Sequence, residues 1–372
     1  MMMQDLPLSF RENVINKLRS LYSTGGYSLY KMSKFEEYDL YARNKDFLIS
    51  DRVITFLDTN GKLMALKPDV TLSIVKNTRD DEPGLKKLYY NENVYRASND
   101  SHSFKEIPQV GLECLGKLDD YSICEVLELA AKSLLCISEE CVLDVSHLGL
   151  LSAVLDAIEI PVAKREALLN FISEKNTHEM LALCRSCEIA PEKIELLKQV
   201  LAANGKPNVV IPKLRNLLEG VIPMDALDQL ENITEVLAGS PAGKVLRVDF
   251  SAVDDMRYYN GIVFKGYVQS LPSSILTGGQ YDKLMKKMKR KSGSIGFAVY
   301  LDMLERMDLG KRSFDVDTVL LYEEGASLAA IRAAVEAIKA KGQSVMAQPE
   351  VPENIRYRNL MKLRDKEVVI LE

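Results

Sequence analysis

The spacing of apolar residues predicts a helix and a β-hairpin near the start of the chain. From Phe10 to Leu21, apolar residues recur at intervals of three and four, as they do on one face of an amphipathic helix. Residues 53–67 alternate between apolar and polar on both sides of Asn60-Gly61, a dipeptide that favours the tight turn of a hairpin. Asp69 then stands where its carboxylate can cap a short helix.

Two further strand patterns, at 86–97 and 107–116, are separated by a polar loop. In the second, apolar side chains alternate with Gln109, Gly111 and Glu113, so one face is apolar while the other carries an amide, a gap and a carboxylate. This second face is predicted to be the wall of a pocket. A solvated strand face is the alternative, since it would produce the same alternation.

The middle of the chain is predicted to be mostly helical, with strands resuming after it. Helical spacing extends from Asp119 to about residue 240 and is interrupted by one strand pattern at 141–147. A strand is predicted again at 243–250, and a hairpin at 254–267, where two tyrosines precede an Asn-Gly turn and a second apolar strand follows it. Residues 292–307 are predicted to form a glycine-rich loop that enters a helix.

The C-terminal residues 311–372 are predicted to form a small α/β module, because an Ala-rich helical pattern at 326–341 lies between two short strand patterns. The preceding residues 1–310 combine antiparallel strands with a helical insertion at about 148–240. A domain of antiparallel strands interrupted by helices belongs to the α+β class. The sequence therefore predicts an α+β core followed by the small module.

Composition and charge narrow the possible functions. The chain of 372 residues carries 48 Lys plus Arg against 53 Asp plus Glu, which gives a net charge of −5. A protein whose main partner is a nucleic acid usually carries a basic surplus, so tRNA and DNA are disfavoured as main partners. No apolar run reaches the roughly 18 residues that a membrane span requires, and the first residues lack the order of a signal peptide. A cytoplasmic protein with free cysteines is expected.

Two other motifs carry little weight on their own. Cys184 and Cys187 form a CxxC pair, yet zinc would need two more ligands and His178 is the only obvious neighbour, so no metal or cofactor is expected. Residues 283–291 hold six cations in nine positions, which predicts a solvated helix face, with a docking patch for an acidic partner or for phosphate as the alternative. No His stands at a telling spacing from Ser, Cys or Asp, so nucleophilic catalysis is not predicted.

Five motifs occur in an order that resembles the catalytic core of histidyl-tRNA synthetase, a class II aminoacyl-tRNA synthetase. They cover residues 5–305 and read LKPDVT, VYRASNDSHSFKEIPQVGLECLG, RYYNGIVF, TGGQYD and IGFAVYLDML. The resemblance implies an antiparallel sheet flanked by helices, and a dimer formed through the core. It also implies one of two branches: the synthetase itself, or the paralogue that serves as regulatory subunit of ATP phosphoribosyltransferase in histidine biosynthesis.

The resemblance places an amino-acid pocket at nine positions: Asp69, Thr71, Arg96, Gln109, Glu113, Tyr258, Tyr259, Gly278 and Gly279. Carboxylates with a glutamine and a tyrosine suit an α-ammonium and an imidazole, whose N–H groups need acceptors in a partly dry site. Cross-strand packing is the alternative for the two tyrosines, and a loop before a helix is the alternative for the two glycines. The synthetases prefer Glu at position 69, whereas Asp fits the regulatory branch better.

Two departures from the synthetase pattern remove positive charge from the reacting phosphate. The arginine that steadies the reacting carboxylate and the α-phosphate falls on Asp254, and the arginine that holds ATP in the last motif falls on Met303. Acyl-adenylate formation builds negative charge on phosphate oxygens, so losing one preorganised cation costs about 100- to 1,000-fold in rate. Arg257 falls on the opposite strand face, and Arg306, one turn beyond Met303, is the closer substitute. No catalytic residue is expected.

The resemblance and its departures together favour a regulatory subunit without catalytic activity of its own. Such a subunit would assemble with the short-form catalytic subunit of ATP phosphoribosyltransferase, as a hetero-octamer by resemblance, and would convey feedback inhibition by histidine. A working histidyl-tRNA synthetase and a free-standing histidine sensor are the alternatives. The C-terminal module resembles the beginning of an anticodon-binding domain, and a packing or oligomer-contact role is expected for it rather than tRNA recognition.

Overall fold

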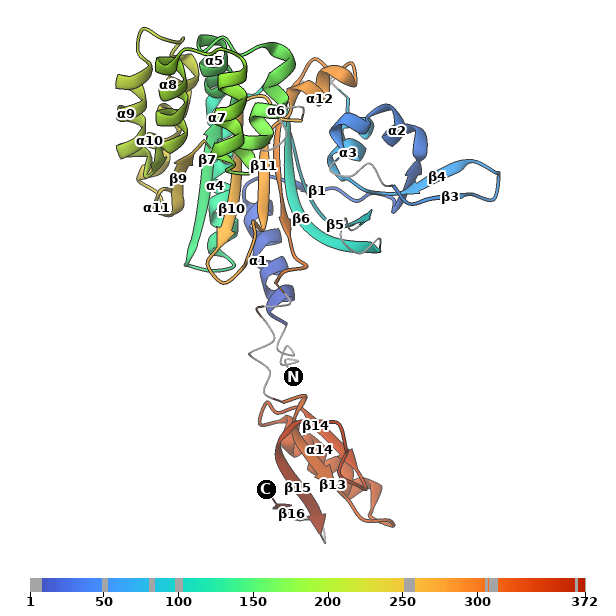
Figure 1. The fold of residues 1–372 in the computed structure, drawn as a ribbon. Helices are drawn as coiled ribbons and strands as arrows, with labels where there is room; N and C mark the ends of the chain where they lie inside the picture. Colours follow the sequence, from blue (N-terminus) through green and yellow to red (C-terminus); the bar gives the residue numbers. More distant parts are fainter. Residues whose placement is uncertain are drawn as a thin grey trace. The chain divides into compact units, whose positions relative to one another are not determined.

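The computed structural model describes most of the chain, namely residues 9–48, 53–79, 84–97, 103–250, 258–304, 307, 314–364 and 367–371. Contacts divide the chain into two compact units. The larger unit is Glu12–Met303, and the smaller unit comprises Leu304–Glu372 together with Met1–Arg11. Figure 1 shows the helices and strands of both units, which are described separately below.

The larger unit is built on a nine-stranded sheet in the order β1-β5-β6-β12-β11-β10-β7-β9-β8. From β5 to β7 every neighbouring pair is antiparallel, whereas β1 pairs with β5 and β9 pairs with β7 in parallel. The strands are β1 (Ser28–Leu29), β5 (Lys86–Ala97), β6 (Phe104–Gly116), β7 (Cys141–His147), β8 (Asn204–Gly205), β9 (Leu246–Asp249), β10 (Ile262–Val268), β11 (Leu276–Gln280) and β12 (Gly293–Tyr300).

Helices α1 (Phe10–Thr24) and α4 (Asp120–Leu135) pack together beside this sheet. The Tyr22 hydroxyl of α1 and the Ser133 hydroxyl of α4 form a buried hydrogen bond of 2.9 Å. Gly266 of β10 lets α4 approach closely, because a Cβ there would lie 2.7 Å from the Leu134 side chain. The amphipathic helix predicted from Phe10 onward is therefore confirmed, with its apolar face buried.

A second layer packs against the long strands β5 and β6 on the side where the candidate site lies. It contains α2 (Tyr38–Arg43), the 3₁₀ turn Lys45–Phe47, α3 (Thr71–Asn77), α12 (Asp282–Lys287) and a small antiparallel sheet of β2 (Phe35–Glu37), β4 (Leu63–Leu66) and β3 (Thr55–Leu57). The predicted hairpin at Asn60-Gly61 is present between β3 and β4, and Gly61 supplies the positive φ of 76° that its turn requires.

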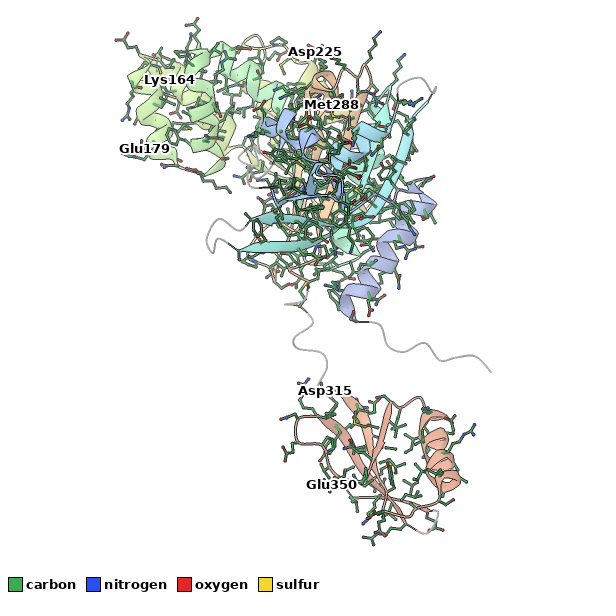
Figure 2. The ribbon with its side chains drawn as sticks, turned by 90° about the vertical axis from the view of Figure 1, so that its right-hand side faces the viewer. Lys164, Glu179, Asp225, Met288, Asp315 and Glu350 are labelled. Atoms are coloured by element: carbon green, nitrogen blue, oxygen red, sulfur yellow. The ribbon has the colours of Figure 1, made fainter. Side chains whose placement is uncertain are left out.

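The helical insertion follows β7 and returns to the sheet at β9. Its helices are α5 (Leu148–Ala157), α6 (Val162–Ser173), α7 (Thr177–Ser186), α8 (Pro191–Ala202), α9 (Pro207–Leu218), α10 (Asp225–Ala238) and α11 (Pro241–Val245). Figure 2 shows Lys164 and Glu179 on the insertion's outer surface. Within the described residues no helix is both long and apolar enough to pass through a bilayer.

The smaller unit is a four-stranded sheet, β14-β13-β15-β16, that carries a helix. Its elements are β13 (Val316–Leu321), α14 (Leu328–Lys339), β14 (Val345–Gln348), β15 (Tyr357–Arg364) and β16 (Glu367–Ile370). Leu320, Ala334, Ile338 and Leu363 form its core. The sequence pattern predicted the helix and the strands around it but missed β15, whose alternation of apolar and basic side chains is weak. The larger and smaller units together give the predicted α+β class.

Two local predictions were wrong. Residues 293–300 form strand β12 rather than a glycine-rich loop, because they pair along their whole length with β6 and with β11. The predicted strand through Tyr258 and Tyr259 is absent from the described part of that segment, and residues 251–257 lie outside it. Asn260 instead binds the neighbouring strand end, since its backbone N–H donates to the Gln280 carbonyl at 3.0 Å and its side chain bonds Asp282.

Candidate functional site

A cavity of about 400 Å³ lies between β6, β11 and β12 on one side and the α2–α3 layer on the other. That volume is within the range of about 300–1,000 Å³ typical of small-ligand sites. Seven of the nine predicted pocket residues line it: Asp69, Thr71, Arg96, Gln109, Glu113, Tyr258 and Tyr259. These residues come from segments nearly 200 positions apart, and the fold brings them to one wall.

Asp69 and Thr71 reach the cavity because helix α3 begins there. The Leu72 N–H donates to the Asp69 carboxylate at 2.8 Å, so Asp69 caps the first turn of α3 as the sequence predicted. Burial raises the pKa of Asp69, while the Leu72 amide and the nearby Arg96 cation lower it in part. The Arg96 Nε donates to the Pro68 carbonyl at 3.0 Å and so fixes the guanidinium beside this turn.

Glu113 is the centre of the polar network. It is 2% exposed, and its carboxylate accepts hydrogen bonds from the Thr71 hydroxyl at 2.7 Å and from the Tyr281 hydroxyl. Burial raises the pKa of Glu113 to about 8, and these two hydrogen bonds oppose part of that rise. A buried carboxyl that ionises near neutral pH gains most from a ligand that brings a cationic or N–H donor group.

Gln109 has an unmet hydrogen-bonding requirement. Its side chain is 3% exposed, and its Nε2 has no hydrogen-bond partner in the part of the chain that the structure describes. Buried amide donors are rarely left unpaired, because the desolvation cost is then uncompensated. An acceptor on a bound ligand would satisfy this donor. Arg96 is the one cation among the described residues that line the cavity.

The aromatic side chains form one edge of the cavity. The rings of Tyr258 and Tyr259 lie edge-to-face with centroids 4.7 Å apart, and Tyr258 also contacts Tyr281 and Phe47. Both tyrosines therefore pack against other aromatic rings and also line the cavity. Tyr281 was not predicted as a site residue, although it belongs to the TGGQYD motif, and only the structure shows that it reaches Glu113.

The structure places the two predicted glycines outside the cavity lining. A Cβ on Gly278 would lie 2.7 Å from the Phe264 ring, and one on Gly279 would lie 2.8 Å from the Tyr259 ring. Their described role is close packing within β11. The glycine that borders the cavity is Gly296 of β12, which pairs with Glu113 and leaves room for its carboxylate. The sequence pattern does not point to Gly296, because the glycine-rich residues 292–307 are typical of a loop that enters a helix.

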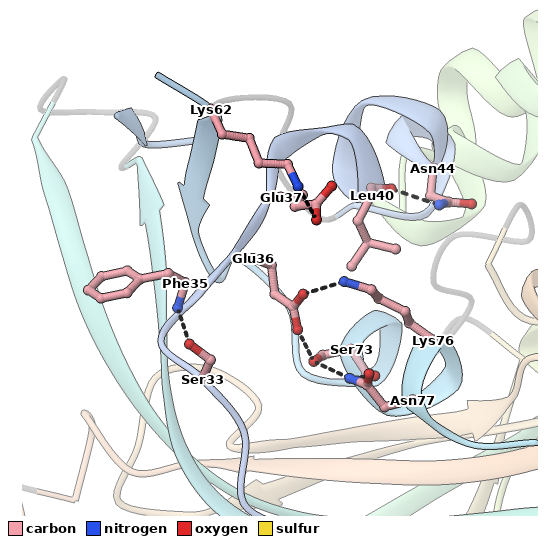
Figure 3. Close-up of polar contacts among 10 residues, drawn as sticks. All are labelled: Ser33, Phe35, Glu36, Glu37, Leu40, Asn44, Lys62, Ser73, Lys76 and Asn77. Carbon is pink, nitrogen blue, oxygen red and sulfur yellow. Dashed lines mark hydrogen bonds and ion pairs between the residues drawn. The ribbon is translucent and has the colours of Figure 1, made fainter. Parts of the chain in front are cut away.

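A partly buried ionic cluster holds helix α3 in place. Figure 3 shows the Glu36 carboxylate of β2 between two donors of α3, the Ser73 hydroxyl at 2.8 Å and the Lys76 ammonium at 2.6 Å. Asn77 donates to the Ser73 carbonyl at 2.9 Å. Since the first turn of α3 presents Thr71 to the cavity, this cluster positions one wall of the site.

We expect Glu36→Ala to lower the free energy of unfolding by about 2 kcal/mol, less than the 3–5 kcal/mol typical of breaking a fully buried ion pair. The reduction follows from Lys76, whose side chain is 38% exposed and can be rehydrated. Chemical denaturation measures the change. Glu37→Ala is the matched control, because Glu37 pairs with Lys62 at the surface and should leave the unfolding midpoint unchanged. Equal losses in both variants would contradict a special role for the cluster.

Of the two positions that replace the synthetase arginines, Asp254 and Met303, only Met303 lies among the described residues. Asp254 and its neighbour Arg257 lie outside the described residues, as does Arg306. Met303 is described and half-buried, and the Ser273 hydroxyl lies 3.2 Å from its thioether sulfur. A thioether is a weak acceptor without charge, so Met303 offers no counter-ion for a triphosphate.

The family model described as histidyl-tRNA synthetase matches residues 7–304, which is most of the chain. The chain belongs to this family. The same span holds the long antiparallel sheet, the α3 turn and the cavity, so family membership and the site rest on the same residues. The resemblance that the five motifs suggested is thereby confirmed.

Curated relatives of this family member carry two kinds of name. The ATP phosphoribosyltransferase regulatory subunit of Clostridium kluyveri is 29% identical over 298 residues, which are 78% of this chain and 75% of that protein. The histidine–tRNA ligase of Methanocaldococcus jannaschii is 26% identical over 317 residues, 84% of this chain and 74% of the ligase. Among solved structures, the ATP phosphoribosyltransferase regulatory subunit/histidyl-tRNA synthetase of Bacillus halodurans has a TM-score of 0.79 at 24% identity, covering 97% of this chain and 98% of that one.

Proposed function

We propose that this chain is the non-catalytic regulatory subunit of ATP phosphoribosyltransferase in histidine biosynthesis, and that histidine is its effector. Many curated relatives of similar length bear that name, including those of Oceanobacillus iheyensis and Caldanaerobacter subterraneus. The observation that carries the proposal is a contrast within one fold. Seven of the nine predicted pocket residues line the cavity, while the positions for the phosphate-holding arginines are occupied by Asp254 and Met303.

The cavity supports an amino-acid effector with an N–H-bearing side chain. Glu113 and Asp69 offer buried carboxylate oxygens to an ammonium or an imidazole N–H. Gln109 Nε2 and the Arg96 guanidinium offer donors to a carboxylate. Histidine carries an ammonium, a carboxylate and an imidazole, and its size suits a cavity of about 400 Å³. We therefore assign the nine predicted positions to histidine recognition, with the two glycines acting through packing.

The proposed partners follow from the regulatory role. A short-form catalytic subunit of ATP phosphoribosyltransferase would bind this chain, and the larger unit would pair with a second copy of itself. A hetero-octamer is the assembly that the resemblance implies. A histidine signal must reach the partner's active site as a difference in affinity between two states of the assembly. Helix α3, tied both to the cavity and to β2, is a candidate element for that transmission.

Reconstitution tests the regulatory role directly. The purified chain is mixed with a short-form catalytic subunit, and product formation is measured with and without histidine. We expect the mixture to be active where the catalytic subunit alone is not, and histidine to inhibit it. A Gln109→Leu variant should still activate the catalytic subunit while losing histidine inhibition, because it removes a buried donor without changing the surface. Failure of the wild-type chain to bind or activate the catalytic subunit would contradict the proposal.

Histidine binding should depend on pH through Glu113. The ligand requires the ionised carboxylate, whereas the pKa of about 8 in the empty cavity keeps Glu113 largely protonated below that pH. Binding then releases up to one proton, so affinity should rise by up to about tenfold per pH unit from pH 6 and level off near pH 8. Calorimetry in two buffers of different ionisation enthalpy counts the proton. An affinity that is flat between pH 6 and 8 would contradict this role of Glu113.

A further inference from the structure

A second cavity of about 570 Å³ lies in the larger unit, apart from the amino-acid pocket, and shares none of that pocket's lining residues. Several elements meet there: the end of α3, the start of β5, the turn from β6 into α4, and the link between α12 and β12. Each contributes a cation, and together these are Arg79, Lys86, Lys117, Arg290 and Lys291. Part of the basic run at 283–291 is therefore placed at this cavity. Figure 2 marks Met288, the first residue of this link.

The three carboxylates that line this cavity accept hydrogen bonds from uncharged N–H donors. Asp119 accepts from the Ser122 N–H at 2.8 Å and caps α4, and Asp120 accepts from Gln229 at 2.7 Å. Both oxygens of Asp282 are used, one by the Ser294 N–H and one by the Asn260 amide. These three acids therefore serve the fold as hydrogen-bond acceptors. Each of them keeps its negative charge, so the three acids offset three of the five cations that line the cavity.

One of these cations, Arg290, has a structural role, whereas Arg79 and Lys117 can contact a ligand. Arg290 donates to the Val75 carbonyl at 3.0 Å and to the Thr78 carbonyl, so it holds the end of α3. Arg79 and Lys117 are exposed at the rim, and neither forms an ion pair with another residue that the structure describes. In a protein whose net charge is −5, the described lining of this cavity has five cations against three carboxylates, a local surplus of two positive charges.

Three glycines form part of the wall. Gly84, Gly116 and Gly293 line the cavity without side chains. Gly116 has a φ of 142°, and a Cβ there would lie 2.7 Å from the Gly84 carbonyl oxygen, so a larger residue cannot occupy this position without strain. Small residues of this kind let a ligand approach between cations that project from separate elements.

We propose that this cavity binds a small polyanion of the phosphate class, with Arg79 and Lys117 as its principal contacts. The concave shape and the glycine wall favour a compact molecule with several negative oxygens over an extended acidic segment of a partner protein. Charge-assisted hydrogen bonds from Arg and Lys are the strong contacts that phosphate oxygens form. The site does not depend on the proposed regulatory function and adds a second ligand to the chain.

Calorimetric titration of the full chain with inorganic pyrophosphate tests the proposal. We expect saturable binding that weakens as salt is raised, and a loss of about tenfold for Arg79→Gln and for Lys117→Gln, as expected for a charge-assisted hydrogen bond. Lys286→Gln is the matched control, since Lys286 belongs to the same basic run but does not line the cavity, and it should change affinity less than twofold. Thermal melting confirms that all three variants are folded.

Three outcomes would overturn the proposal. One is the absence of binding at millimolar pyrophosphate. Another is an equal loss in the Lys286→Gln variant, which would show a diffuse basic surface. The third is binding that develops only when the acids that follow Arg79 in the sequence, Asp80, Asp81 and Glu82, are changed to amides, because the chain would then neutralise its own cations. Histidine binding should be unchanged in Lys117→Gln, which separates this site from the amino-acid pocket.

Discussion

Histidine affinity should fall by about 100-fold in a Glu113→Gln variant, the loss expected when a buried charge-assisted hydrogen bond of about 2–3 kcal/mol is removed. The carboxylate of Glu113 is the buried acceptor on which Thr71 and Tyr281 converge, and it faces the cavity. An amide of the same shape keeps the packing, because one hydroxyl can still donate to the amide oxygen while the other reverses its role and accepts from the new NH₂ group. Isothermal titration calorimetry measures the change in affinity.

The melting temperature of the Glu113→Gln variant shows whether the variant is folded. The pKa of Glu113 in the folded chain, about 8, lies above its ordinary value of 4.5, so the ligand-free protein should lose stability as the pH rises between these values. Removing the ionisable group removes this loss, and Glu113→Gln should therefore melt at a higher temperature than the wild type at pH 8. Glu106→Gln, on the exposed part of the same strand, should change neither histidine affinity nor the melting profile. Wild-type affinity in Glu113→Gln would rule out the assigned role.

Filling the gap at Gly296 should have the second large effect. A Cβ on Gly296 would collide with the Glu113 carboxylate and would lie 2.5 Å from the Leu112 carbonyl oxygen. Backbone cannot yield as a flexible side chain can, so we expect Gly296→Ala to lower the free energy of unfolding by about 2–4 kcal/mol. It should also remove measurable histidine binding, because Glu113 is pushed from its hydrogen bonds. Denaturation curves and calorimetry on the same sample measure both effects.

Gly239→Ala is the matched control for this substitution. Gly239 follows α10, and a Cβ there would have nothing within 4 Å. We therefore expect it to leave both the unfolding midpoint and histidine affinity close to those of the wild type. If Gly296→Ala behaved like this control, the close approach of β12 to Glu113 would have no energetic consequence, and the description of the cavity wall would be wrong.

Local patterns along the chain were enough to predict the elements that carry the site. The alternation around Gln109 and Glu113, the capping position of Asp69 and the Asn60-Gly61 turn each depend on a few neighbouring residues, and all three occur in the structure. The periodicity of apolar residues cannot predict that side chains as distant in sequence as Asp69 and Tyr259 line one cavity, whereas the resemblance of the motifs did predict it. The α+β class followed from the order of these elements.

Features that depend on tertiary contact could not be predicted in this way. Strand β12 was missed because its glycines look like a loop until β6 and β11 lie on either side of it. The link from Tyr281 to Glu113 joins residues 168 positions apart. The close packing of Gly278 against Phe264 and of Gly279 against Tyr259 depends on rings from other segments of the chain. Each of these depends on the assembled sheet rather than on local sequence.

We propose that the chain recognises histidine but cannot activate it. The most direct measurement is the exchange of labelled pyrophosphate into ATP in the presence of histidine, with histidine binding to the same preparation verified by calorimetry. With Asp254 and Met303 at the positions of the phosphate-holding arginines, we expect binding without exchange above the background of a histidine-free control. Exchange at the rate of a working synthetase would contradict the account.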